Sequence, residues 1–250
     1  MYKIVITAGG TSERIDNVRK ITNSSSGKLG SVIASKLLEK KGDKIEKIYY
    51  VCSKNSIKPI GNKIEVIEIV DTADLEVAIR KLLIDNKIDY FIHSMAVSDY
   101  TVDYVTTAEI LAEAINDKND TLKTIVNFDS KLVADKISSN YENLIIKLKK
   151  TPKIISIIKS LSPKTYLVGF KLLDKVSEDK LLQVAYDLKE KNSCDLVVAN
   201  DLNNIRQGEH KAFILKTKED YVLANDKEDI AEKLIKEMLK DAWLWKSVFE

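Results

Sequence analysis

The sequence has few of the residues that build disulfides, metal centres or membrane spans. Its 250 residues include two cysteines, Cys52 and Cys194, and two histidines, His93 and His210. Two thiols exclude a disulfide scaffold and a four-thiolate zinc site, and they indicate a reducing compartment, where we expect both to be buried packing residues. Neither histidine has a partner at metal-ligand spacing, so we assign neither a role. No apolar run approaches the ~18–20 residues that a membrane span needs.

The net charge is also small. The 40 basic residues are balanced by 38 acidic ones, leaving +2. This balance argues against a dedicated nucleic-acid binder, because displacing counterions from phosphates requires an excess of lysine and arginine. The first residues, Met-Tyr-Lys-Ile-Val-Ile-Thr, lack the charged region and the cleavage site of a signal peptide and instead indicate a strand. These absences predict a cytoplasmic protein without a membrane or nucleic-acid partner.

Strand-like and helix-like segments alternate regularly along the chain. β-Branched and aromatic residues are concentrated in six short runs, at 3–7, 47–52, 64–70, 89–94, 165–170 and 195–199. Helical patterns follow them, at about 27–41, 73–86, 106–116, 153–161, 176–192 and 227–241. The alternation predicts an α/β fold of three layers, Rossmann-like, with a mainly parallel sheet and helices on both faces. Ligands of such folds bind beyond the carboxyl ends of the strands.

The remaining segments complete the expected organisation. Asp226 is the predicted N-cap of the last helix. Residues 211–224 predict a hairpin, and the polar stretch at about 101–150 predicts a flap-like excursion from the core. We therefore expect a single α/β domain over residues 1–240, followed by a tail at 241–250 that holds both tryptophans.

Four of the eight glycines fall within the first thirty residues, in two loops that favour an anion. Gly9 and Gly10 follow the first strand, and such a pair lets backbone N–H groups approach a phosphate, although a tight strand exit explains it equally well. Residues 23–30, Asn-Ser-Ser-Ser-Gly-Lys-Leu-Gly, then place three hydroxyls and two glycines at the expected start of the first helix. Neither loop has the spacing of the Walker lysine loop or of G-x-G-x-x-G, which disfavours a P-loop kinase and a dehydrogenase.

Two further segments have the chemistry to contact a ligand. Residues 94–100, Ser-Met-Ala-Val-Ser-Asp-Tyr, follow a predicted strand. Asp99 would accept hydrogen bonds from a ligand or approach a metal ion, unless it only caps the next turn. From Lys136 to Lys164 there are seven lysines and one acid, Glu142. A solvated surface is the commoner origin of such a run, and contact with a polyphosphate is the alternative.

Together these segments resemble the phosphopantothenate–cysteine ligase family of coenzyme A biosynthesis. The matching pieces, in the family's order, are ITAGGTSERIDNVRKITNSSSGKLG, SMAVSDY, DKISS, KLKKTPKII, VGFKLLD and DLVVAND. They extend from Ile4 to about Lys240, which is nearly the whole chain. Many bacterial members carry a flavin-dependent decarboxylase domain upstream; nothing here matches it, so the resemblance implies the stand-alone form.

The resemblance implies a ligase that works in two steps. A nucleoside triphosphate with Mg²⁺ activates the carboxylate of 4′-phosphopantothenate as an acyl-nucleotidyl anhydride, and pyrophosphate leaves. The amine of L-cysteine then attacks this anhydride. CTP is the favoured nucleotide because the stand-alone bacterial form is the nearer match, and ATP is the alternative because the Gly-Phe-Lys piece also matches the eukaryotic branch. A homodimer with shared active sites is implied as well.

Residue roles follow from the motif positions. The resemblance assigns the nucleotide phosphates to Gly9, Gly10, Ser25, Ser26, Gly27 and Gly30, the base and sugar to Phe170 and Asn200, and phosphopantothenate to Met95, Ala96 and Asp99. It assigns contact with the acyl intermediate to Asn23, formation of the acyl-nucleotide to Lys136, and a phosphopantothenate contact across the dimer interface to Arg19.

Several positions depart from the commoner bacterial pattern, and other functions fit less well. Met95 and Ser98 replace small alanines, and Lys153 stands where the family has an aspartate, which reverses a charge near the nucleotide. An NAD(P)-linked short-chain enzyme would need a Tyr-x-x-x-Lys pair, but Tyr100 is followed at that spacing by Tyr104. A non-catalytic nucleotide-binding regulator is the remaining alternative.

Overall fold

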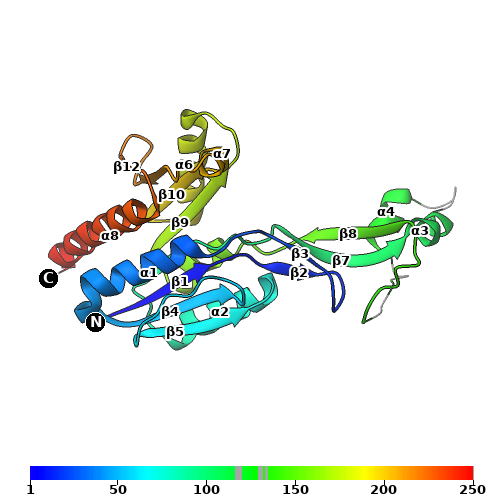
Figure 1. Cartoon of the computed structure of the whole chain (residues 1–250), viewed down its shortest axis with the longest axis horizontal. Helices are drawn as coiled ribbons and strands as arrows, with labels where there is room; N and C mark the ends of the chain where they lie inside the picture. Colours follow the sequence, from blue (N-terminus) through cyan, green and yellow to red (C-terminus); the bar gives the residue numbers. More distant parts are fainter. Residues whose placement is uncertain (116–119, 129–131, 133–134, 250) are drawn as a thin grey trace.

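An eight-stranded sheet forms the centre of the molecule in the computed structural model (Figure 1). The structure describes residues 1–115, 120–128, 132 and 135–249, with the backbone alone at 241–249. In order across the sheet, the strands are β12 (Tyr221–Ala224), β11 (Ala212–Leu215), β10 (Leu196–Asp201), β9 (Tyr166–Leu173), β6 (Tyr90–His93), β1 (Tyr2–Ala8), β4 (Ile45–Ser53) and β5 (Ile64–Ile69). From β10 to β5 all neighbours pair in parallel, whereas β11 pairs antiparallel with β10 and β12.

The strand order reverses between β1 and β6. From β1 the chain proceeds to β4 and β5 on one side, and it then returns to β6, β9 and β10 on the other. In open α/β sheets the crevice at such a reversal is where ligands bind, at the carboxyl ends of the strands. The register places Thr7 beside His93, and His93 beside Gly169, at this end of the sheet.

Helices cover both faces of the sheet. The helices α1 (Lys28–Lys41) and α8 (Lys227–Phe249) lie on one face, and α2 (Thr72–Asp85), α5 (Ile154–Leu161) and α6 (Glu178–Asn192) on the other, while η1 (Gly42–Lys44) and α7 (Leu202–Arg206) are short connections. Neighbouring residues of β1 enter different cores: Ile4 and Ile6 pack with α1, and Val5 packs with α2. Burial on both faces explains why the central strands are apolar at consecutive positions. Within the described residues, no helix is long and apolar enough to cross a membrane.

A long arm projects from the body (Figure 1). Its stem is an antiparallel pair, β7 (Tyr100–Thr107) and β8 (Leu144–Lys150), with α3 (Ala108–Ala114) and α4 (Thr121–Val126) at the far end and the hairpin β2 (Ser12–Arg14) to β3 (Lys20–Thr22) beside it. The rings of Tyr104 and Phe128 lie 5.2 Å apart, and both residues are buried, which gives the far end a small core of its own. At the root, the N–H of Thr151 donates to the carbonyl of Asp99 at 3.1 Å.

The structure confirms the α/β fold class and the core elements expected from the sequence. All six predicted strands and the hairpin at 211–224 are present, and Asp226 accepts from the N–H of Asp229 at 2.8 Å as the N-cap of α8. The helix predicted at 106–116 begins later, because Thr106 and Thr107 continue β7 and pair with β8. Both are β-branched, which favours a strand. The last helix continues beyond its predicted end at 241 to Phe249.

Candidate functional site

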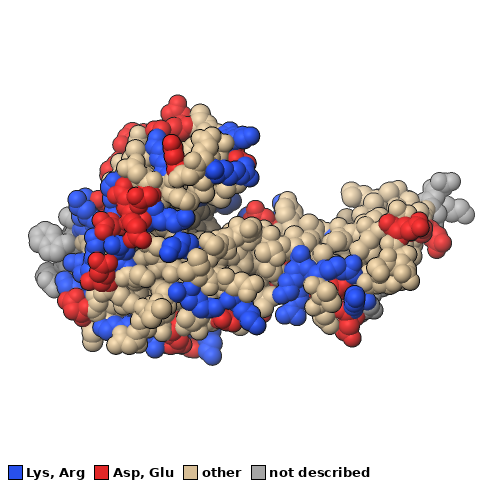
Figure 2. Space-filling model, viewed as in Figure 1, with Lys and Arg blue, Asp and Glu red and all other residues tan. Residues whose placement is uncertain are grey.

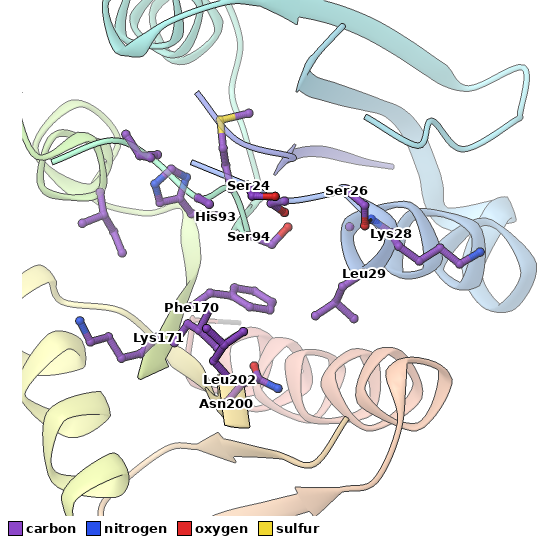
Figure 3. Close-up of a pocket in the computed structure, with 18 of the residues that line it drawn as sticks. Ser24, Ser26, Lys28, Leu29, His93, Ser94, Phe170, Lys171, Asn200 and Leu202 are labelled. Carbon is purple, nitrogen blue, oxygen red and sulfur yellow. Dashed lines mark hydrogen bonds between the residues drawn. The ribbon is translucent and has the colours of Figure 1, made fainter. Parts of the chain in front are cut away.

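A cavity of about 510 Å³ opens at the carboxyl ends of β6, β9 and β10 (Figure 3). Its walls come from the segment entering α1, the loop after β6, the start of α5 and the ends of β9 and β10. Figure 3 draws Lys28 and Leu29 on one side of it and His93 on the other, with Ser24 and Ser94 between them. The cavity therefore occupies the crevice at the strand-order reversal, as the fold class predicts.

The N-termini of α1 and α5 both reach this cavity, and their N-cap residues, Gly27 and Lys153, provide no side-chain cap. In α1, Oγ of Ser26 accepts from the N–H of Lys28 at a long 3.4 Å. In the other α-helices that the structure describes, the residue before the helix accepts from its first turn, and these residues are Asp71, Thr107, Asp120, Ser177, Asp201 and Asp226. The first amides of a helix have no partner within the helix, and the helix dipole makes this end positive. A helix whose N-cap residue has no side-chain acceptor leaves first-turn amides available for an external anion.

Glycines let α1 approach the strands closely. Gly27 precedes α1 with φ 72°, a left-handed conformation that glycine adopts without strain. A Cβ on Gly30 would lie 2.7 Å from the Cβ of Ala8 and 3.1 Å from Oγ of Ser94. Ser25, Ser26, Gly27 and Gly30, all expected at the phosphates, line the cavity together.

Gly9 and Gly10 serve the packing of the loops beneath this wall. A Cβ on Gly9 would lie 1.9 Å from Oγ of Ser56, and one on Gly10 would lie 1.7 Å from the carbonyl oxygen of Asn23. Within the described lining of the cavity, neither glycine is present, and Asn23 is also absent. The two glycines therefore affect the cavity indirectly. They allow the close packing that positions Asn23, and the lining segment at residues 24–27 follows Asn23 directly.

A hydrogen-bond network fixes the loop after β6. Oγ1 of Thr11 donates to Oγ of Ser98 at 3.1 Å and accepts from the N–H of Ser98 at 2.9 Å. Oγ1 of Thr151 donates to the carbonyl of Ser98 at 2.6 Å. Beside this network Lys153 donates to the carboxylate of Asp99, and the charged ends of both side chains are largely exposed. The network holds Met95, Ala96 and Asp99, all expected at phosphopantothenate, in the cavity wall.

The opposite wall comes from β9, β10 and α8. Phe170 and Asn200, the residues expected at the base and sugar, both line it. Nδ2 of Asn200 donates to the carbonyl of Lys211 at 3.2 Å, which fixes the amide plane. At the same wall Nζ of Lys227 lies 3.0 Å from Nε2 of His210.

The charges around the cavity favour an anionic ligand. Among the described residues that line it, the cations are Lys28, Lys153, Lys171 and Lys227, and the one carboxylate is Asp99. Four lysines and two helix N-termini suit a polyphosphate. Groups of three or more histidine, cysteine or acidic residues able to hold a metal ion do not occur in the described part of the chain.

Arg19 and Lys136 lie together, outside the described lining of the cavity. The N–H of Ile137 donates to Oδ2 of Asp16 at 3.1 Å, and the Arg19 guanidinium donates to the same oxygen at 2.6 Å and to the carbonyl of Ile137 at 2.7 Å. This guanidinium holds the pKa of Asp16 well below its usual range. The tip of the β2–β3 hairpin is thus fastened to the segment that carries Lys136.

Most of the lysine run lies outside the cavity. Lys147 and Lys149 pair with Asp103, and Lys159 pairs with Asp195. Of the seven lysines only Lys153 is among the described lining residues. Figure 2 shows blue and red side chains interspersed over the visible face of the body. With Lys153 and its partner Asp99, four of the seven lysines form ion pairs within the described residues, in agreement with the commoner explanation.

The two cysteines are packing residues, as the sequence predicts. Both are buried, and burial raises the pKa of Cys52 to about 11 and that of Cys194 to about 12. Thiols with such pKa values are poor nucleophiles at neutral pH.

Sequence reasoning missed both histidines, which line the cavity. His93 is 8% exposed, and its Nδ1 lies 2.9 Å from Oγ1 of Thr7. Burial lowers the pKa of His93 to about 4, so the ring is neutral at neutral pH. The signal in the sequence was the position of His93 at the carboxyl end of a predicted strand, the end at which α/β folds bind ligands.

Comparison with known proteins decides the family. The DNA/pantothenate metabolism flavoprotein C-terminal domain family matches residues 1–129 and 105–242. The chain belongs to this family. A crystal structure of the DNA/pantothenate metabolism flavoprotein from Streptococcus pneumoniae is 38% identical, with a TM-score of 0.84, and the alignment covers 96% of this chain and 99% of that one.

Curated relatives of the family are longer. The coenzyme A biosynthesis bifunctional protein CoaBC of Thermococcus kodakarensis is 32% identical over 213 residues, which cover 85% of this chain and 44% of the relative. The CoaBC protein of Escherichia coli K12 is 26% identical over 206 residues, covering 82% and 42%. The chain thus spans about half the length of the curated relatives it matches. A Cab2 mutant in complex with phosphopantothenate-cysteine shares the fold, with a TM-score of 0.64 at 17% identity.

Proposed function

We propose that this protein is a phosphopantothenate–cysteine ligase that joins 4′-phosphopantothenate to L-cysteine through an acyl-nucleotidyl intermediate. The observation that carries the proposal is the cavity at the strand-order reversal, onto which two helix N-termini, whose N-cap residues provide no side-chain acceptor, and four lysines converge. The family of the chain, and the coenzyme A biosynthesis named in its curated relatives, supply the reaction class.

The first step needs charge neutralisation more than a protein nucleophile. A carboxylate oxygen of the acid attacks the α-phosphorus, the new O–P bond forms, and pyrophosphate leaves with the electron pair of the broken bond. Attack by one anion on another is slow unless the phosphate charge is neutralised and the two groups are held in line. The amides of α1 with Ser25, Ser26 and Gly27 would hold the phosphates, and the lysines of the cavity would neutralise them.

The second step transfers the acyl group to cysteine. The amine attacks the acyl carbon, the nucleoside monophosphate leaves, and the amine releases a proton to solvent or to the leaving phosphate. Negative charge develops on the acyl oxygen during this attack, and a hydrogen-bond donor stabilises it. Asn23 is the proposed donor, with Phe170 and Asn200 at the base and sugar of the nucleotide.

The co-substrate is proposed to be CTP, with ATP as the alternative, together with Mg²⁺. Mg²⁺ prefers oxygen ligands and in such sites is held by one or two carboxylates plus the phosphates themselves. Asp99, the single carboxylate of the described lining, fits that requirement. When bound, the ion would add positive charge at the triphosphate during activation.

Arg19 is proposed to contact phosphopantothenate in the active site of a second copy of the chain, and Lys136 is proposed to assist formation of the acyl-nucleotide. The clamp through Asp16 keeps both near the arm and away from the described lining of their own cavity. A homodimer with shared sites accounts for this separation.

A pyrophosphate-release assay on the purified chain tests the function. We expect release that requires 4′-phosphopantothenate, Mg²⁺ and one of CTP, ATP or UTP, with the amide product formed only after L-cysteine is added. Asn23→Ala should slow the second step more than the first, and Lys136→Ala should slow activation. No release with any of the three nucleotides would refute the proposal.

A further inference from the structure

His93 is a buried polar side chain at the edge of the cavity for which the proposed reaction has no role. It is the last residue of β6, beside β1, where the strand order reverses. The residue is 8% exposed and lines the cavity. Its Nε2 atom makes no hydrogen bond to any described residue. Among the described residues, the one fully buried side-chain polar atom without a partner is Oγ1 of Thr106, so Nε2 of His93 is not fully buried and is accessible from the cavity.

The neighbouring Thr7 determines which ring nitrogen carries the hydrogen. Thr7 is fully buried, and within the described residues its hydroxyl has one partner, Nδ1 of His93 at 2.9 Å. A buried hydroxyl hydrogen needs an acceptor, so Thr7 donates to Nδ1. A neutral imidazole that accepts at Nδ1 carries its hydrogen at Nε2. The cavity thus receives a neutral N–H donor.

The two sides of the cavity have different donors. The ring of His93 projects to the same face of the sheet as Phe91, toward α2, α5 and α6, whereas α1 lies on the other face. Figure 3 shows the same separation, with His93 and Lys28 on opposite sides. A nucleotide whose phosphates lie at the N-terminus of α1 would leave the His93 side for the second substrate.

We propose that the Nε2–H of His93 donates a hydrogen bond to a carboxyl oxygen of the acid substrate and so positions the other oxygen for attack on the α-phosphorus. This inference rests on the proposed ligase function. His93 keeps its proton throughout: the O–P bond forms and pyrophosphate departs without any proton transfer. A neutral donor suits this task, because a cationic imidazolium would stabilise the attacking carboxylate before the transition state is reached. In the second step the same N–H faces the acyl oxygen as its negative charge grows.

Nitrogen-15 NMR of the histidine rings tests the donor directly. The chain has two histidines, and the spectrum of a His93 variant assigns them. We expect the Nε2–H tautomer for His93 in the free protein. The Nε2 signal should shift when 4′-phosphopantothenate is added and stay unchanged with CTP or ATP alone. The Nδ1–H tautomer, or a shift caused by nucleotide alone, would overturn the inference even if the ligase activity stands.

Kinetics of paired variants test its effect on the reaction. His93→Phe alone leaves the Thr7 hydroxyl without an acceptor, so the Thr7→Val/His93→Phe double variant removes both partners and protects the fold. We expect this variant to lose about 100-fold in kcat/KM for the acid, while KM for the nucleotide changes less than about threefold. His93→Gln, which keeps an amide N–H near the same place, should recover at least about tenfold of that loss.

The outcomes separate the inference from the function it rests on. If the wild-type chain releases no pyrophosphate, the ligase function is refuted. The proposed hydrogen bond from His93 to the acid substrate is then refuted as well. A wild-type chain that is active while the double variant is equally active refutes the inference alone. Equal losses for acid and nucleotide would also refute it, because they would indicate a general structural effect.

Discussion

Gly10 and Gly42 are both glycines, but a side chain added at these two positions would have very different surroundings. A Cβ on Gly10 would lie 1.7 Å from a backbone oxygen of Asn23, whereas one on Gly42 would meet no atom within 4 Å. Gly42 also has an ordinary helical φ of −53°. We therefore expect Gly10→Ala to displace the segment that leads into the cavity and to lower the free energy of unfolding by about 2 kcal/mol or more.

Urea denaturation of the two alanine variants checks this difference. The free energy of unfolding of Gly42→Ala should lie within about 0.5 kcal/mol of the parent value. It could be slightly higher, because alanine restricts the conformations of the unfolded chain. A Gly10→Ala protein as stable as Gly42→Ala would contradict the packing described around Asn23.

His93 also makes stability depend on pH. Its pKa is about 4 in the folded chain, lowered by burial from 6.5. Between these pH values His93 binds a proton in the unfolded state but not in the folded state. The free energy of unfolding therefore decreases as the pH falls from 6.5 to 4. The predicted loss over this window is about 3 kcal/mol.

Denaturation at a series of pH values measures this loss. The Thr7→Val/His93→Phe variant should lack this part of the pH dependence, because position 93 then carries no titratable group. His210, whose pKa is also lowered by burial, contributes equally in parent and variant. Matching slopes for parent and variant between pH 6.5 and 4 would show that the ring is not buried as a neutral group.

At the scale of elements, one carboxylate fastens the β2–β3 hairpin to the segment at 135–137. Asp16 accepts from the N–H of Val18 at 2.9 Å, of Arg19 at 2.7 Å and of Ile137 at 3.1 Å, in addition to the guanidinium of Arg19. Its pKa lies well below the usual range, so the charged form persists in acid. The stability that it contributes is complete above the unfolded pKa of about 3.9 and is lost only below it.

Asp16→Ala should release this fastening without unfolding the core. We expect hydrogen exchange at the amides of Arg19 and Ile137 to accelerate by at least about tenfold, since each loses its carboxylate acceptor. The exposed residue Asp43 supplies the control, and Asp43→Ala should leave those amides unchanged. Unaltered protection in Asp16→Ala would mean that other contacts hold the segment.

The strands of the body could be predicted from the sequence and those of the arm could not, for physical reasons. Strands such as β1 and β10 are buried on both faces, and their continuous apolar runs identify them. β8 is half-buried or exposed along its length and alternates Lys147 and Lys149 with apolar residues, so its sequence resembles a surface segment. The partner that makes it a strand is β7, and no local pattern identifies that partner.

The same reason applies to the site. Glycines and serines at the start of α1 are recognisable because they are adjacent in sequence. The hydrogen bond between His93 and Thr7 joins residues 86 positions apart. It depends on the register of β1 and β6, which the sequence does not give. Helix caps behaved in the opposite way: Asp226 was predictable because its partner lies three residues away.

At the scale of the whole molecule, the proposed dimer predicts that inactive chains can complement one another. If Arg19 acts in the partner's site while Asn23 acts in its own, a dimer of Arg19→Ala with Asn23→Ala contains one intact site and one doubly altered site. Mixing equal amounts, with time for subunits to exchange, should restore about a quarter of the wild-type activity.

Light scattering and assays of the separate variants complete this test. Each variant alone should be dimeric and nearly inactive. A mixture that stays inactive, although subunits have exchanged, would place both residues in the site of the same chain.

The root of the arm has a consequence for how this protein can vary. Tyr100 pairs with Lys150, and Thr151 is hydrogen-bonded to Ser98 and Asp99, so the arm departs and rejoins at neighbouring points. A tight two-residue turn could bridge those points, as in any hairpin. Excision of the arm is therefore expected to leave the eight-stranded sheet in place, although it would also remove Asp135 and Ile137, the hydrogen-bond partners of Asn17 and Asp16 in the β2–β3 hairpin. The root of the arm also contributes Asp99 and Lys153 to the cavity wall. A tilt of the arm would therefore change the shape of the cavity.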